Sequence, residues 1–239
     1  MDNALHALAV NRQRGLATEL NTIANNMANL STPGFRRERV LFSEFVHAAR
    51  RGESVSMADT GARVADPRGG GLRVTGGALD FALEGAGYFL VEGGEAGPLL
   101  TRAGAFQRSR EGLLVTAEGR AVLDDGRAPV FLPPGGEVTA APDGTLSIDG
   151  GPIARLAVAT APAETLARAG DTAFRAEGAI EPVAEPRVRQ GALEGSNVEP
   201  VVEIARMIEV SRAYEHARQL VEDEDERIRN VLRTLGQPA

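Results

Sequence analysis

The apolar residues near the start of the chain follow helical spacing. Successive members are separated by four, three, four and three residues, which places them on one stripe of an α-helix. No proline occurs between Asp2 and Leu30, and the pair Pro33-Gly34, which ends helices, comes directly afterwards. We therefore predict an amino-terminal helix within residues 1–35. The members of this stripe are Leu16, Leu20, Ile23, Met27 and Leu30.

A longer stripe of the same kind follows Pro200. Its members alternate steps of three and four, except where Glu224 takes the place of an apolar residue, so the pattern is a heptad seam with one polar gap. Proline is tolerated in a first helical turn, and Gly236 stands where the stripe ends. We predict a second helix from about Asn197 to Thr234. The members of this stripe are Met207, Val210, Tyr214, Ala217, Val221, Ile228, Val231 and Leu235.

Between the two helical regions the pattern changes to short apolar or alternating runs separated by turn signals. Asp125-Gly126, Asp143-Gly144 and Asp149-Gly150 are pairs typical of tight turns between strands. The runs between them have the length and composition of β-strands. They are YFLVE (88–92), GLLVT (112–116), PVFLP (129–133), TLSID (145–149) and ARLAVAT (154–160).

These patterns predict an α+β chain with a β-rich domain inserted between two terminal helices. We expect an assembly helix in residues 1–35, a loosely structured connector in 36–70, the β-rich domain in 71–190 and a second assembly helix in 191–239. The connector is predicted from its many arginines among small residues. Each helix has an apolar face too narrow and too long for the β domain to cover. We therefore expect the helices to pair as an antiparallel coiled coil and to be buried further by neighbouring copies.

Composition and charge narrow the possible functions. The net charge is −7 and the pI is about 5.2, which argues against a surface that binds nucleic acid or an anionic membrane. There is no cysteine, so disulfides, thiol nucleophiles and thiolate metal sites are excluded. No run of 18 apolar residues occurs, and the first 30 residues do not have the pattern of a secretory leader. We expect neither membrane insertion nor a cleaved signal peptide.

The sequence predicts no catalytic, cofactor or metal site. His6, His47 and His216 are scattered, and the glycines near Gly85 and Gly69 do not open a helix, as a phosphate-binding loop must. Acidic residues beside glycine, such as Asp124-Asp125, are ordinary in β turns. A carbohydrate-binding or hydrolytic β protein with a coiled-coil stalk is an alternative of a different class. It is disfavoured because aromatic residues are only 4% and tryptophan is absent.

Motifs at the start, middle and end of the chain resemble those of one protein family. The segment NNMANLSTPGF (25–35) resembles the signature near the start of bacterial flagellar rod and hook proteins. Three middle segments are similar to that family's β-domain motifs, and GALEGSNVEPVVEIARMIEVSRAYE (191–215) resembles its carboxyl-terminal motif. The middle segments are TGGALDFALEGAGYFLVE (75–92), LTRAGAF (100–106) and GLLVTAEGRAVL (112–123).

The resemblance implies a structural subunit and no enzyme. Such subunits polymerise helically, with their terminal helices in an inner tube and their β domains outside, to make the drive shaft of the flagellum. The chain length favours a rod protein over a hook protein, and the MIEVSRAYE segment favours the proximal rod, with the distal rod as the alternative. The implied partners are other rod subunits, further copies of the chain and the flagellar export apparatus. The implied location is the periplasmic rod, reached by type III export without a cleaved leader, and no cofactor is implied.

The candidate functional residues are those expected to become buried at the assembly interface. Asn25, Asn26 and Asn29 either cap the first helix or bond to neighbouring subunits. The acidic run Glu222–Glu226 either faces solvent or pairs with the arginine-rich connector of an adjacent subunit. The full set consists of Leu16, Leu20, Ile23, Asn25, Asn26, Met27, Asn29, Leu30, Met207, Val210, Tyr214, Val221, Ile228, Val231 and Leu235.

Overall fold

The computed structural model describes residues 2–48, 54–170 and 172–235, and the chain divides into two compact units. Unit 1 contains Met1–Ala28, Glu38–Arg63 and Glu199–Ala239. Unit 2 contains Asn29–Arg37 and Val64–Val198. Both helices and many strands are present, which confirms a mixed α and β chain.

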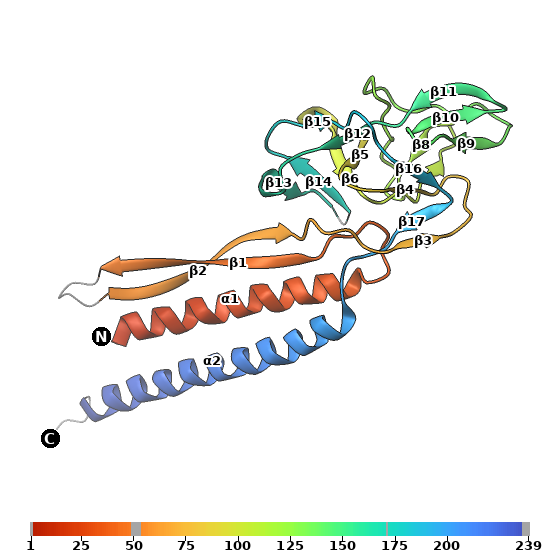
Figure 1. Cartoon of the computed structure of the whole chain (residues 1–239). Coiled ribbons are helices and arrows are strands. Elements are labelled where there is room, and N and C mark those ends of the chain that lie inside the picture. Colours follow the sequence, from red (N-terminus) through yellow and green to blue (C-terminus); the bar gives the residue numbers. More distant parts are fainter. Residues whose placement is uncertain (1, 49–53, 171, 236–239) are drawn as a thin grey trace. The chain divides into compact units, whose positions relative to one another are not determined.

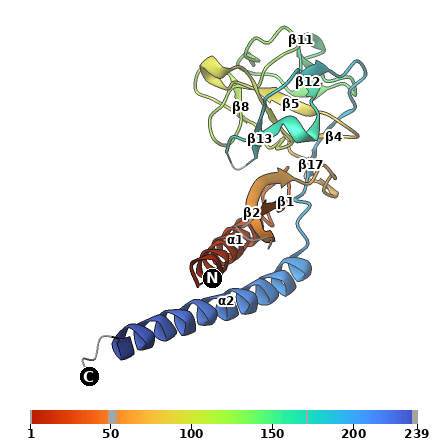
Figure 2. The same ribbon diagram turned by 90° about the vertical axis from the view of Figure 1, so that its left-hand side faces the viewer.

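Unit 1 holds two long helices and a two-stranded ribbon. Helix α1 spans Asp2–Ala28 and helix α2 spans Pro200–Leu235. Strands β1 (Glu38–Ala48) and β2 (Ser54–Ala65) pair with each other, and the ribbon lies along α1 in both Figure 1 and Figure 2. Within the described residues, neither helix combines the length and the apolar character needed to cross a membrane.

The ribbon occupies the segment for which we expected a loosely structured connector, so that expectation is wrong. The residues RVLFSEFV (39–46) are rich in β-branched and aromatic side chains, the composition that favours strands. The arginines suggested a connector, but arginine is compatible with β-strands, so their number did not justify that prediction. The β-branched and aromatic residues between the charges indicate the strands.

The end of α1 differs from the prediction by a few residues, and the turn that follows explains the Pro-Gly pair. Residues Asn29 to Phe35 form successive turns, in which Thr32 N–H donates to Asn29 O and Phe35 N–H donates to Thr32 O. Gly34 has a φ of +70°, and a Cβ at this position would lie 2.2 Å from the backbone nitrogen of Ala103. Only glycine fits this close approach without strain.

Unit 2 is built from short antiparallel strands around one six-stranded sheet, ordered β13-β14-β6-β5-β12-β15. Small pairs β16-β4, β17-β3 and β7-β8 and the three-stranded β11-β10-β9 complete it. The bounds of the strands are β3 Leu72–Val74, β4 Phe81–Leu83, β5 Tyr88–Val91, β6 Leu99–Thr101, β7 Gln107–Arg108, β8 Leu114–Val115, β9 Val138–Ala140, β10 Thr145–Ile148, β11 Gly151–Arg155, β12 Val158–Thr160, β13 Leu166–Arg168, β14 Ala173–Ala176, β15 Glu181–Pro182, β16 Val188–Gln190 and β17 Ala192–Glu194.

The core of unit 2 has two parts, one on each face of β5. Phe89 and Val91 point into the larger cluster, whereas Tyr88 and Leu90 point into the smaller one. Both faces of this strand are therefore covered, which explains its uninterrupted apolar sequence. Phe89 also packs edge-on against Phe106, with ring centroids 5.3 Å apart.

Most of the predicted strand runs are strands, and one predicted turn sets a hairpin. Asp149 and Gly150 both have positive φ, 49° and 81°, and they connect β10 to β11 as a two-residue loop. The run at 154–160 divides between β11 and β12, whereas the run at 129–133 makes only isolated bridges. Residues 192–194, expected to belong to the second assembly segment, form β17 in unit 2.

Candidate assembly interface

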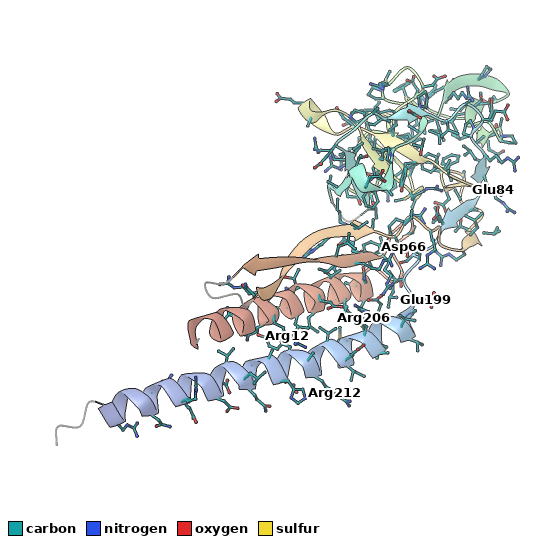
Figure 3. The ribbon with its side chains drawn as sticks, turned by 60° about the vertical axis from the view of Figure 1, so that its left-hand side comes forward. Arg12, Asp66, Glu84, Glu199, Arg206 and Arg212 are labelled. Atoms are coloured by element: carbon teal, nitrogen blue, oxygen red, sulfur yellow. The ribbon has the colours of Figure 1, made fainter. Side chains whose placement is uncertain are left out.

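Helices α1 and α2 contact each other through polar side chains as well as apolar ones. The contacts follow opposite chain order: positions rise along α1 as they fall along α2. Figure 3 shows Arg206 between the two helices and Arg212 on the far side of α2. The polar pairs are Asn26 Nδ2 to Glu203 Oε2 at 3.3 Å, Arg206 Nε to Glu19 Oε1 at 2.8 Å, and Gln13 Nε2 to Tyr214 OH at 3.3 Å.

The candidate interface residues differ in how far a single chain already covers them. Ile23, Asn26 and Val210 are buried, and so is Ala217 of the same seam. The side chains of Ile228, Val231 and Leu235 lie outside the described residues. The remaining candidates are half-buried: Leu16, Leu20, Asn25, Met27, Asn29, Leu30, Met207, Tyr214 and Val221. Part of the seam is therefore in contact within the chain.

A second apolar stripe on α2 escaped the sequence analysis. Val201, Ile204 and Ile208 are separated by steps of three and four, and their exposed fractions are 79%, 47% and 50%. Val202 is also exposed. We call Val201, Ile204 and Ile208 the outer stripe. The spacing is present in the sequence, but Val201 and Ile204 lie before Met207, where the heptad seam begins.

Asn26 holds the start of β1 against α1. Its Nδ2 donates to Glu38 O at 2.9 Å and its Oδ1 accepts from Glu38 N–H at 2.9 Å, so the amide pairs with the backbone as a neighbouring strand would. The second hydrogen of Nδ2 reaches Glu203 Oε2 on α2. Glu203 and Glu38 are both buried, so these bonds satisfy groups that water does not reach. The asparagine thus connects three elements of unit 1.

Replacing Asn26 by alanine should destabilise unit 1 by about 1–3 kcal/mol, because it removes three hydrogen bonds to buried backbone and carboxylate groups. Asn21 lies on the same helix but is exposed, so Asn21→Ala is the matched control and should change stability by less than about 0.5 kcal/mol. Urea denaturation followed by far-UV circular dichroism measures both. Equal effects of the two substitutions would contradict the role assigned to Asn26.

Unit 2 contains a buried ion cluster of Arg36, Arg102 and Glu194, exposed by 1%, 6% and 2%. Glu194 bridges the two arginines: Oε1 lies 2.8 Å from Arg36 Nη1, and Oε2 lies 3.1 Å from Arg102 Nη1. Gly70 N–H donates to Oε1 at 3.0 Å. Burial lowers the pKa of Arg102, an effect that the nearby Glu194 carboxylate opposes.

Three family models match successive parts of the chain. The model described as "Flagella basal body rod protein" matches residues 2–36, "Flagellar hook protein FlgE/F/G D1 domain" matches 82–149, and "Flagellar basal body rod FlgEFG protein C-terminal" matches 189–234. The flagellar basal-body rod protein FlgF of Caulobacter vibrioides is 36% identical, with 99% of each chain covered. The chain belongs to the family of flagellar basal-body rod proteins. FlgF of Mesorhizobium japonicum is 34% identical over 99% of each chain, and FlgG of Agrobacterium fabrum is 31% identical over 96% of this chain and 98% of its own.

As a member of the rod family, the chain is a structural subunit of the flagellar basal body. The matched segments also show how this fold is held together. Arg36 comes from the first matched segment, Arg102 from the second and Glu194 from the third. The ion cluster therefore connects all three parts of a rod protein within unit 2.

Proposed function

We propose that the chain is a proximal rod subunit that polymerises helically through α1 and α2. The observation that carries the proposal is the match to FlgF proteins at 34–36% identity over nearly the full length of the chain. The assembled rod serves as the shaft that transmits flagellar torque. The partners are other rod subunits and further copies of this chain, and the flagellar export apparatus delivers them. The proposal includes no catalytic activity.

In this proposal the two helices pair as an antiparallel coiled coil. The opposite order of the contacts between α1 and α2 supports this arrangement. The burial of Val210 and Ala217, which are seven residues apart in the heptad seam, supports it as well. The seam then serves contacts within the subunit over its first half.

The outer stripe is the surface that neighbouring subunits cover. A large aliphatic side chain gains about 1.5–3 kcal/mol when it is fully buried, and the outer stripe has three such side chains that are about half exposed or more. In a helical lattice the free energies of many such contacts together stabilise the polymer. The half-buried residues of the α1 stripe extend the same interface, and Asn25 and Asn29 lie at its end.

A distal rod position is the alternative within the family. FlgG proteins match over nearly the same length, at 31% identity for Agrobacterium fabrum and 28% for Bacillus subtilis. The FlgF identities range from 29% to 36%, and the three at 34–36% favour the proximal position. A tag on the chain, located by electron microscopy in purified basal bodies, distinguishes the two positions.

Removal of residues 200–239, which contain α2, tests the proposed route of assembly. The intact chain should co-purify with basal bodies and restore swimming to a strain without its gene. The shortened chain should keep the β-sheet circular dichroism signal of unit 2, but it should neither co-purify with basal bodies nor restore swimming. Removal of residues 236–239 alone is the control and should have no effect. A chain without α2 that still enters basal bodies would contradict assembly through α2.

A further inference from the structure

A pocket of about 570 Å³ in unit 2 has the buried ion cluster in its wall. Arg36, Arg102 and Glu194 line it together with the small residues Gly69, Gly70, Gly85 and Ala86. Leu72 and Leu83 add apolar surface. The volume lies in the range of sites that bind ligands, about 300–1,000 Å³.

The charges around the pocket leave one positive charge in excess at the buried cluster. Glu194 is shared between two arginines, so the cluster carries two positive charges and one negative charge. Glu84 also lines the pocket, but it is exposed and lies 3.4 Å from Arg189 at the surface. A buried excess charge is costly unless an opposite charge or strong hydrogen-bond acceptors compensate it.

The hydrogen bonds of the cluster leave donors on both guanidinium groups. Arg36 contacts Arg68 O and Glu194 through Nη1. Arg102 uses Nη1 for Leu83 O and Glu194 and uses Nη2 for Gly85 O at 2.6 Å. Among the residues that the structure describes, the Nε atoms of Arg36 and Arg102 are buried without an acceptor. A guanidinium has five N–H donors, so these bonds leave both groups with donors that no acceptor within the described residues pairs.

The chemistry that fits this pocket is a carboxylate. Arginine binds carboxylates through planar, charge-assisted hydrogen bonds, and glycines allow a ligand to approach the backbone closely. The chain itself carries a suitable ligand in its acidic run, Glu222–Glu226. Glu222, Asp223 and Glu226 are exposed, and Glu222 forms a surface ion pair with Arg218 at 3.2 Å. The net charge of the chain is −7, so a positive pocket is unusual on it and complements the acidic run of another copy.

The mouth of the pocket favours a protein ligand over a free acid. Leu72 on β3 lines the pocket and is 42% exposed, and Val74 on the same strand is also exposed. A small acid would leave Leu72 exposed to water, whereas a helix that presents an acidic side chain covers it. The exposed Leu72 and the buried charges of the pocket therefore fit a helix that carries an acidic side chain.

We propose that this pocket receives a glutamate or aspartate side chain from the acidic run of a second copy of the chain. The inference rests on the proposed function as a polymerising rod subunit, and it adds a contact between unit 2 of one copy and α2 of another. In the assembled rod this contact supplements the apolar contacts of the outer stripe and sets the register between copies.

Binding of a synthetic peptide to the full-length chain tests the inference. The peptide covers residues 218–230, and a second peptide replaces its five acidic residues by their amides. Fluorescence anisotropy at low protein concentration should show binding of the acidic peptide only, and added salt should weaken it. Binding of both peptides alike, or of neither, would overturn the inference.

Variants of Ala86 connect the binding to the pocket, because this residue is exposed at its wall. Ala86→Glu places a competing carboxylate there and should weaken peptide binding by about tenfold or more. Ala86→Gln has the same size without the charge and should have a much smaller effect. If both variants bind the peptide as the unaltered chain does, the pocket is not the site.

Competition by free glutarate distinguishes a small free acid from an acidic side chain of a second copy as the ligand of the pocket. A second copy as the occupant predicts that glutarate competes with the peptide only at much higher concentration. Glutarate that binds as tightly as the peptide would overturn the proposed occupant in favour of a free acid. Incorporation into basal bodies is measured separately: a chain that enters the rod but does not bind the peptide refutes this inference and leaves the proposed function intact.

Discussion

Glu194→Gln should lower the free energy of unfolding of unit 2 by about 3–5 kcal/mol, because it leaves two buried guanidinium groups without their shared counter-charge. Glutamine has nearly the same size and can still accept a bond from Gly70 N–H, so the loss is electrostatic and not a packing defect. Urea denaturation followed by the near-UV circular dichroism of buried Tyr88 and Phe174 measures it, since these rings pack against each other in unit 2.

The matched control removes the same charge at the surface. Glu84 pairs with Arg189 at 3.4 Å, and both side chains are about half exposed, so Glu84→Gln should cost no more than about 1 kcal/mol. A triple replacement of Arg36 and Arg102 by Met and of Glu194 by Leu should recover much of the stability lost in Glu194→Gln. An effect of Glu194→Gln as small as that of Glu84→Gln would contradict the role assigned to the buried cluster.

Replacing Ile204 and Ile208 together by aspartate should abolish swimming and reduce incorporation into basal bodies by more than about tenfold, because it places charge on the surface that we propose neighbouring subunits cover. Both side chains are about half exposed in the single chain, so α2 should still form and the chain should remain soluble. Western blotting of purified basal bodies and swimming assays give the two readouts.

Two further substitutions in α2 separate assembly from folding. Gln219→Asp adds a charge at an exposed polar position and should leave swimming unchanged. Val210→Asp places a charge at a buried position and should lower the stability of unit 1 itself. If the Ile204 and Ile208 double variant unfolds as Val210→Asp does, its loss of assembly would reflect misfolding and the outer stripe would have no special role.

The helices could be predicted from sequence because their pattern is local. Steps of three and four residues and the breakers Pro33, Gly34 and Gly236 lie within a few turns of the residues they affect. The Asp149-Gly150 hairpin was predictable for the same reason. The β-branched and aromatic composition of residues 39–46 was an equally local signal for a strand, and the arginines around it pointed to a connector instead.

The contacts of distant residues were not predictable in this way. Arg36, Arg102 and Glu194 are separated by many residues, and each alone looks like an ordinary surface charge. Asn26 was expected either to cap the helix or to contact a neighbouring subunit, but no local pattern specifies its pairing with Glu38. A sequence also cannot say which of two apolar stripes on one helix is covered within the chain.

Side-chain footprinting with hydroxyl radicals tests most directly whether subunits cover the outer stripe on assembly. Val201, Ile204 and Ile208 are exposed in the single chain and should react readily there, while the exposed Phe131 of unit 2 serves as the reference. In purified basal bodies we expect their reactivity to fall strongly relative to Phe131. Equal reactivity of the outer stripe in the free chain and in basal bodies would contradict assembly through α2.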